Sequence, residues 1–147
     1  MIEMARCRKL RNNFYSMDLH YGKTMLKPYR QFHCFFIVEH SCNKDFMHQQ
    51  ALQLLMSQCC NFEFHGACCR EWELAFDEMD IMIHPNEEDE IAITNSWEDI
   101  DDFVETLELT LSLRPIVPFD VYLIYDDEAK YQMVIKKLEE IEATSTL

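Results

Sequence analysis

One stretch of the sequence decides the fold class: Phe32-His33-Cys34-Phe35-Phe36-Ile37-Val38-Glu39. It is short, almost continuous in apolar residues and rich in residues that favour strands, and it ends on a carboxylate. A run of this kind predicts a strand that is buried on both faces. Three later runs have the same character in weaker form, and they cover residues 61–65, 91–95 and 121–125.

Each of these four runs precedes a segment in which apolar residues recur at helical spacing. The first two segments predict helices over residues 44–59 and 69–82. The third helix contains residues 100–111, and Ser96 with Asp99 three residues later resembles a capping sequence. Asp126 and Asp127 are placed to cap a last helix that ends near residue 142.

Four strand-helix units in series predict an α/β fold. We expect a single domain over residues 31–143, with a four-stranded, mainly parallel sheet and helices on both of its faces. A basic N-terminal arm over residues 1–30 precedes the domain, and residues 144–147 form a tail. In such folds, functional sites lie beyond the carboxyl ends of the strands.

Charge is the strongest global signal. The chain of 147 residues has 13 Lys and Arg against 27 Asp and Glu, a net charge of −14. The predicted arm carries +5, from seven basic and two acidic residues, so the rest of the chain carries −19. This body repels nucleic acids and anionic membranes and favours basic partners, while acidity also serves solubility alone. The arm could touch nucleic acid, but its charge predicts that it folds back onto the body.

The sequence shows no export signal and no apolar run of about 20 residues that would span a membrane. We therefore expect a cytoplasmic protein. The seven cysteines include no Cys-x-x-Cys spacing, and reduced thiols that pack as small apolar residues are the simplest expectation.

Several motifs resemble an uncharacterised family of small bacterial α/β domains. The resemblance covers roughly residues 32–142 and includes Gly66-x-x-Cys69-x-x-Trp72, Thr94 with Trp97 and Asp99, and the strand and helix after Pro118. The family pattern usually has Trp before the glycine, whereas this chain has His65. The resemblance implies the same α/β fold and no established activity. In type, a short, acidic chain without catalytic motifs is similar to immunity proteins that neutralise bacterial toxins.

The best catalytic candidate combines thiols and imidazoles at the strand ends. Cys42 or Cys69 could act as nucleophile with His40 or His65 as base, oriented by Glu39 or Asp126. Cys69 lies near a predicted helix N-terminus, which lowers a thiol pKa. Packed polar residues at loop mouths are the alternative, and we assign no catalytic residue. The chain contains only two glycines and no phosphate-binding loop, which argues against nucleotide binding.

A metal site built from His40, His65, Cys68 and Cys69 matches no common ligand spacing. We therefore predict neither a metal nor another cofactor. Trp72 and Trp97 both lie near helix starts, where tryptophans usually fill the core. Trp97 is the better candidate for exposure, because its neighbours are polar.

The leading hypothesis is a non-enzymatic immunity protein that blocks the active site of a basic toxin domain, most readily a nuclease. An aromatic anchor ringed by charges is typical of interfaces, so we expect Trp97 with Glu98, Asp99, Asp101 and Asp102 to bind the partner. The acidic loop Glu87, Glu88, Asp89 and Glu90 is a second candidate surface, and the acidic face of the second helix, with Glu71, Glu73, Asp77 and Glu78, is a third. A small enzyme that uses the Cys/His cluster, and a nucleic-acid mimic that counters a defence system, are the alternatives.

Overall fold

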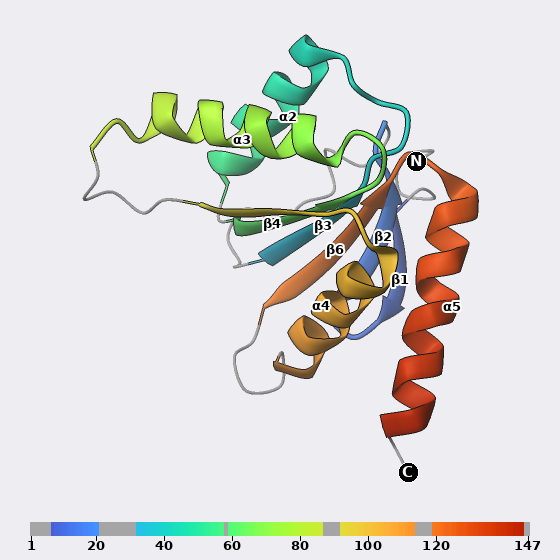
Figure 1. Ribbon diagram of the computed structural model, residues 1–147. Coiled ribbons are helices and arrows are strands. Elements are labelled where there is room, and N and C mark those ends of the chain that lie inside the picture. Colours follow the sequence, from blue (N-terminus) through green and yellow to red (C-terminus); the bar gives the residue numbers. More distant parts are fainter. Residues whose placement is uncertain (1–6, 21–31, 58, 87–91, 114–118, 146–147) are drawn as a thin grey trace.

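The computed structural model describes residues 7–20, 32–57, 59–86, 92–113 and 119–145. They form six strands and four helices (Figure 1). The strands are β1 (Cys7–Arg11), β2 (Phe14–Asp18), β3 (Phe32–Ile37), β4 (Cys59–His65), β5 (Ile93–Trp97) and β6 (Asp120–Tyr125). The helices are α2 (Lys44–Leu55), α3 (Cys69–Ile83), α4 (Ile100–Leu113) and α5 (Glu128–Ser145).

The strands form one sheet in the order β1-β2-β6-β3-β4-β5. All neighbours are parallel except β1 and β2, which form an antiparallel pair. The predicted α/β class and the mainly parallel sheet are therefore confirmed, but the predicted number of four strands is wrong. The two additional strands come from the segment predicted to be an arm. They add to the sheet because β2 pairs over its whole length with β6, and β1 pairs with β2.

The centre of the sheet lies where the opening stretch predicted it. Phe32, Cys34 and Phe36 of β3 join one hydrophobic core, whereas Phe35 and Ile37 join the core on the opposite face. Alternate side chains of a strand point to opposite faces, so a strand between two cores is apolar throughout. The helices α2 and α3 cover the first core, and α4 and α5 cover the second (Figure 1).

One local prediction fails at the start of α4. Ser96 does not cap this helix, because it belongs to β5 and its hydroxyl donates a hydrogen bond to Glu73. Asp99 takes that place, since its carbonyl oxygen accepts from the N–H of Phe103 and its carboxylate accepts from the N–H of Asp101 at 2.7 Å. The strand therefore runs two residues further than predicted.

The described part of the predicted arm, residues 7–20, also lies against the body, as its charge predicted. The guanidinium group of Arg11 in β1 forms a bidentate ion pair with the carboxylate of Glu142 in α5.

Among the described residues, no helix has the length and apolar character needed to cross a membrane.

Candidate functional site

The parallel strands β3, β4 and β6 all end at the same end of the sheet, as the topology predicted. Three strand ends bring Glu39, His65 and Asp126 into one region. The loop after β3 is fastened to the neighbouring strand β4, because the N–H of Val38 donates to the His65 carbonyl at 2.7 Å. The indole N–H of the buried Trp72 also donates to the carbonyl of Ser41 at 2.6 Å.

The carboxylate of Asp126 occupies the place at the end of β3 where a doubly wound fold often binds a phosphate. It accepts the backbone N–H groups of three consecutive residues, Glu39, His40 and Ser41, at 2.7, 2.9 and 2.9 Å. Consecutive N–H groups that converge in this way form a typical anion-binding nest. Because a side chain of the chain itself occupies the nest, a phosphate could enter only by displacing Asp126.

Gly66 makes the turn after β4 possible. Its φ of +120° lies in a region that residues with a side chain rarely adopt. A Cβ atom at this position would lie 2.5 Å from the carbonyl oxygen of Val38. The turn therefore requires glycine, and it brings the N–H of Ala67 to the carboxylate of Glu39 at 2.9 Å.

A disulfide between Cys42 and Cys68 joins the loop after β3 to the start of α3. The expectation of reduced cysteines is therefore wrong for this pair. The two residues are 26 positions apart in sequence, but the Gly66 turn places their Cα atoms within 5.9 Å. The bond also removes Cys42 as a candidate nucleophile and Cys68 as a candidate metal ligand in this state.

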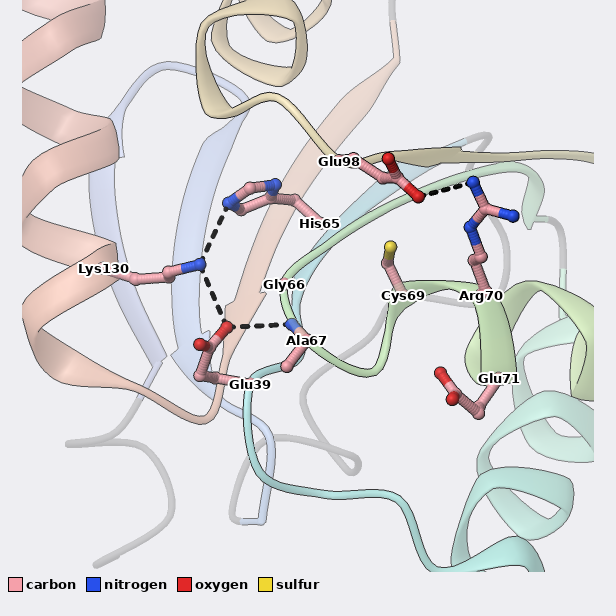
Figure 2. A pocket seen from close by; sticks show the side chains of 9 residues that line it. All are labelled: Glu39, His65, Gly66, Ala67, Cys69, Arg70, Glu71, Glu98 and Lys130. Carbon is pink, nitrogen blue, oxygen red and sulfur yellow. Dashed lines mark hydrogen bonds and ion pairs between the residues drawn. The ribbon is translucent and has the colours of Figure 1, made fainter.

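A hollow of about 380 Å³ opens beside these loops, and we call it the β4 hollow (Figure 2). Lys130, from the first turn of α5, reaches into it between two strand ends. Its ammonium group lies 3.0 Å from the carboxylate of Glu39 and 3.4 Å from Nε2 of His65. Although partial burial disfavours the charge of Glu39, the Ala67 N–H and Lys130 together lower its pKa below the ordinary value.

His65 is fixed in one neutral form by its two neighbours. Its Nδ1 lies 2.8 Å from the carbonyl oxygen of Trp97, which can only accept, so Nδ1 carries the proton. Its Nε2 then presents a lone pair to the ammonium group of Lys130. Burial lowers the pKa of His65, and the positive charge of Lys130 lowers it further. The imidazole thus serves as a link between β4, β5 and α5.

The thiol of Cys69 lies across the β4 hollow from Lys130 (Figure 2). Cys69 is only 3% exposed, and this burial raises the pKa of its thiol. The negative charge of Glu98 raises the pKa further. The helix N-terminus was expected to lower the pKa of the Cys69 thiol, but burial and the charge of Glu98 outweigh that effect. His40 is turned to Asp127 instead, with Nε2 2.8 Å from that carboxylate. The structure does not bring the predicted thiol and imidazole pairs into a hydrogen bond among the described residues.

The residues weighed as metal ligands in the sequence have other partners as well. Within the described ranges, no three His, Cys, Asp or Glu side chains are placed to hold a metal ion. Cys68 is bonded to Cys42, and His65 is held by Trp97 and Lys130.

The predicted partner-binding patch begins at the end of β5. Trp97 is half-buried, and its indole N–H donates to the buried carboxylate of Glu63 at 2.7 Å. Trp97 is more exposed than Trp72, as its polar neighbours predicted, but its ring packs against the core under α4. Glu98, Asp99, Asp101 and Asp102 are all exposed. The acidic loop Glu87, Glu88, Asp89 and Glu90 lies outside the described residues.

A second hollow of about 380 Å³ lies between α4 and α5, and we call it the α4–α5 hollow. Asp101, Glu105 and Glu140 contribute three carboxylates to its lining, against the single cation of Lys137. Lys137 already pairs with Asp101 at 2.8 Å. The β4 hollow has a similar balance, with three carboxylates from Glu39, Glu71 and Glu98 against Lys130 and Arg70. Glu98, two residues before α4, and Asp101, in its first turn, therefore each contribute an acid to one of two negatively charged hollows.

Residues 14–137 match a protein family described as "Domain of unknown function (DUF7684)". The chain belongs to this family. No curated protein and no solved structure shows significant similarity to it. The predicted membership of an uncharacterised family is thus confirmed, whereas the bacterial origin of that family stays a prediction.

The DUF7684 match includes the motif Gly66-x-x-Cys69-x-x-Trp72, and the structure gives its residues physical roles. Gly66 makes the tight turn, while Cys69 and Trp72 lie buried on the first turns of α3 against the sheet. Sequence reasoning missed the central residue of the β4 hollow, Lys130. Its position in the first turn of the last helix, three residues after Asp127, is the signal that could have indicated it.

Proposed function

We propose that this member of DUF7684 is a non-enzymatic binding protein with a basic protein as its partner. In its specific form, the proposal is an immunity protein that occludes the active site of a basic toxin domain such as a nuclease. A nuclease needs positive charge to hold its substrate, so an acidic surface can compete for the same groups. Complementary charge also speeds the encounter between two proteins.

The observation that carries this proposal is the pair of hollows beside the start of α4. Together they are lined by six carboxylates and three cations. Glu98 and Asp101 remain 71% and 67% exposed in their side chains although each pairs with a cation of the chain. Exposed pairs of this kind contribute little to stability and exchange readily. A lysine or arginine side chain of a partner could therefore enter either hollow without breaking a buried interaction.

The state of the cysteines favours binding over cysteine catalysis. Of the two candidate nucleophiles, Cys42 is joined to Cys68 in a disulfide, and Cys69 is buried with a raised pKa. A nucleophilic cysteine needs a lowered pKa and access to its substrate. The small-enzyme alternative therefore has no activated group to support it among the described residues.

Charge reversal at the start of α4 tests the proposal. In the variant Asp101→Lys with Asp102→Lys, both exposed acids lie in the first turn of α4. A matched control is Asp45→Lys with Glu128→Lys, because these exposed acids also lie in first turns, of α2 and α5, but line neither hollow. Both variants change the net charge equally, so they separate a local effect from an overall one.

Proteins captured by the wild-type chain from extracts of its source cells would be identified and purified, and their binding kinetics measured at two ionic strengths. We expect a basic partner whose association is slower with the α4 variant and less dependent on salt, whereas the control variant behaves like the wild type. Expression of that partner should arrest cell growth, and the wild-type chain should relieve the arrest. A neutral or acidic partner, an equal effect of both variants, or a partner without toxicity would contradict the immunity proposal.

A further inference from the structure

The two edges of the sheet differ in a way that bears on binding. The strand β1 forms one edge and β5 the other, and no described strand pairs with the outer side of either (Figure 1). An open edge presents a row of backbone N–H and C=O groups that can pair with another chain. Natural proteins therefore usually protect such edges with basic side chains, prolines or irregular pairing.

The β1 edge has this protection. Its five residues include Arg8, Lys9 and Arg11, and its pairing with β2 is irregular between Lys9 and Arg11. The sequence of β5, Ile93-Thr94-Asn95-Ser96-Trp97, has no charged residue and no proline. Its register with β4 is regular over all five residues. Within the described part of the chain, the β5 edge is therefore regular in register, uncharged and without the protection that β1 has.

One face of β5 is fixed by acidic residues of α3. Alternate positions of the strand meet successive turns of the helix: the hydroxyl of Ser96 donates to Glu73, and that of Thr94 donates to Asp77. The N–H of Ala92, just before the strand, donates to the buried carboxylate of Asp80 at 2.9 Å. Residues two apart in a strand and three or four apart in a helix share a face, which is why these two rows match.

The opposite face of β5 is fixed by Glu63 of β4. This carboxylate is 2% exposed and accepts from the amide of Asn95 at 3.0 Å and from the indole N–H of Trp97 at 2.7 Å. Burial raises the pKa of Glu63, while these two hydrogen bonds act in the opposite direction. Side chains on both faces thus hold β5 in place, although it has a neighbouring strand on one side only.

We propose that the β5 edge binds an extended, basic segment of a partner protein, which adds to the sheet as a seventh strand. A strand that is held rigidly before binding loses less conformational entropy when a segment pairs with it. The backbone hydrogen bonds of the added strand provide affinity, and side chains beside the edge provide selectivity. This inference rests on the proposed function, because it specifies how the basic partner is bound.

Charge complementarity selects the occupant. The exposed carboxylates of Asp77, Glu98 and Asp99 lie on the helix beside β5 and on the residues directly after it. Arg70, the only basic residue of α3, already pairs with Glu98. Lysine or arginine side chains at alternate positions of an added strand would point toward these acids, whereas an acidic segment would be repelled.

A synthetic peptide tests the inference. The probe is a short peptide of alternating lysine and valine, and the control has the same charge with proline in place of each valine, which prevents strand pairing. We expect the probe to bind about tenfold more tightly than the control, because the loss of one or two net backbone hydrogen bonds corresponds to about that factor. Hydrogen exchange should show slower exchange of amides in β5 when the probe is bound.

A pair of proline variants locates the binding edge. In a parallel strand, successive residues point their N–H groups alternately to the two sides, so one of Thr94 and Asn95 points outward. Each of Thr94→Pro and Asn95→Pro loses one side-chain hydrogen bond, to Asp77 or to Glu63. The outward one keeps every backbone hydrogen bond to β4, so it should be the more stable of the two and should lose the advantage of the probe over the control. The other removes a hydrogen bond to β4 and should lower stability. Thermal unfolding identifies which variant is which.

Three results would overturn the inference. The first is equal binding of probe and control, and the second is a bound probe that leaves the exchange of β5 amides unchanged. The third is self-association of the chain that the outward-facing proline variant abolishes, because the occupant would then be a second copy. A toxic basic partner that depends on Asp101 and Asp102 but not on the β5 edge would leave the proposed function intact and remove this inference alone.

Discussion

Replacement of Asp126 with alanine should destabilise the protein more than any other single change among the charged residues of the site. The carboxylate accepts three backbone N–H groups, from Glu39, His40 and Ser41. Asp126→Ala leaves all three without their acceptor. The neighbouring Asp127→Ala is the matched control, because that side chain accepts a single backbone N–H, from Lys130, and pairs with His40.

The size of the effect follows from the burial of the three donors. The bonds from Glu39 and Ser41 are partly buried, whereas the bond from His40 is exposed, so water can replace it. A hydrogen bond to a charged group contributes about 1.5–3 kcal/mol, and the lower end applies to partly buried donors. Two such bonds give a loss of about 3 kcal/mol in the free energy of unfolding. The control loses a helix cap, which costs about 1 kcal/mol.

Urea unfolding followed by tryptophan fluorescence measures this difference. Trp72 is fully buried and donates to the carbonyl of Ser41, so its emission reports on the same loop. A loss of about 3 kcal/mol should also lower Tm by about 10 °C in a chain of this size. Equal losses for Asp126→Ala and Asp127→Ala would show that the three N–H groups do not depend on Asp126, and would refute the reasoning.

Two further predictions concern the turn and the imidazole beside the β4 hollow. Gly66→Ala should lower the free energy of unfolding by about 3 kcal/mol or more, because its Cβ would lie 2.5 Å from the Val38 oxygen at a φ of +120°. The exposed neighbour change Ala67→Ser should cost less than about 0.5 kcal/mol, and similar Tm values for the two variants would contradict the prediction. The pKa of His65 is lowered in the folded state from an ordinary 6.5, so the unfolded chain binds its proton more readily. The contribution of neutral His65 to the free energy of unfolding is therefore fully present above pH 6.5 and is lost as the pH falls below it. Urea unfolding at about pH 7 and about pH 5 should show a smaller decrease in the free energy of unfolding for His65→Gln than for the wild type.

The sequence predicted the centre of the fold because its signals there are local and redundant. The stretch that includes Phe35 and Phe36 is apolar on both faces, and each following helix has one apolar face. Such patterns depend only on alternation along a strand and on the helical period. Parallel topology alone predicted that Glu39, His65 and Asp126 would lie together beyond the carboxyl ends of the strands.

The first two strands escaped prediction because their signals are weak. The strand β1 is basic, and the apolar run of β2 is interrupted by Ser16 and ends on Asp18, so neither resembles a buried strand in the sequence. The dipeptide Asn12-Asn13 between them was the available signal. Asparagine tolerates the left-handed conformation that tight hairpins need, and Asn13 has a φ of 61°.

The contacts of the β4 hollow could not be predicted for a different reason. The approach of Lys130 to Glu39 and His65 depends on how α5 is rotated about its axis, which the packing of its buried residues determines. The Cys42–Cys68 disulfide likewise depends on the Gly66 turn, and seven cysteines allow many pairings. Contacts between distant elements require the assembled core.

The acidic residues behind the net charge of −14 form two groups, one that holds a strand in place and one that does not, and the two look alike in the sequence. The acids of α3 look like a solvated helix face in the sequence, yet Glu73, Asp77 and Asp80 each accept a hydrogen bond from β5 or from the residue before it. Removing them would release the edge strand, so lost binding in such variants would not identify an interface. The acids at the start of α4 are different, because Asp101 and Asp102 are exposed and their side chains hold no strand in place. Charge reversal at the start of α4 is therefore the cleaner test, because Asp101 and Asp102 add charge to the surface without holding β5 in the sheet.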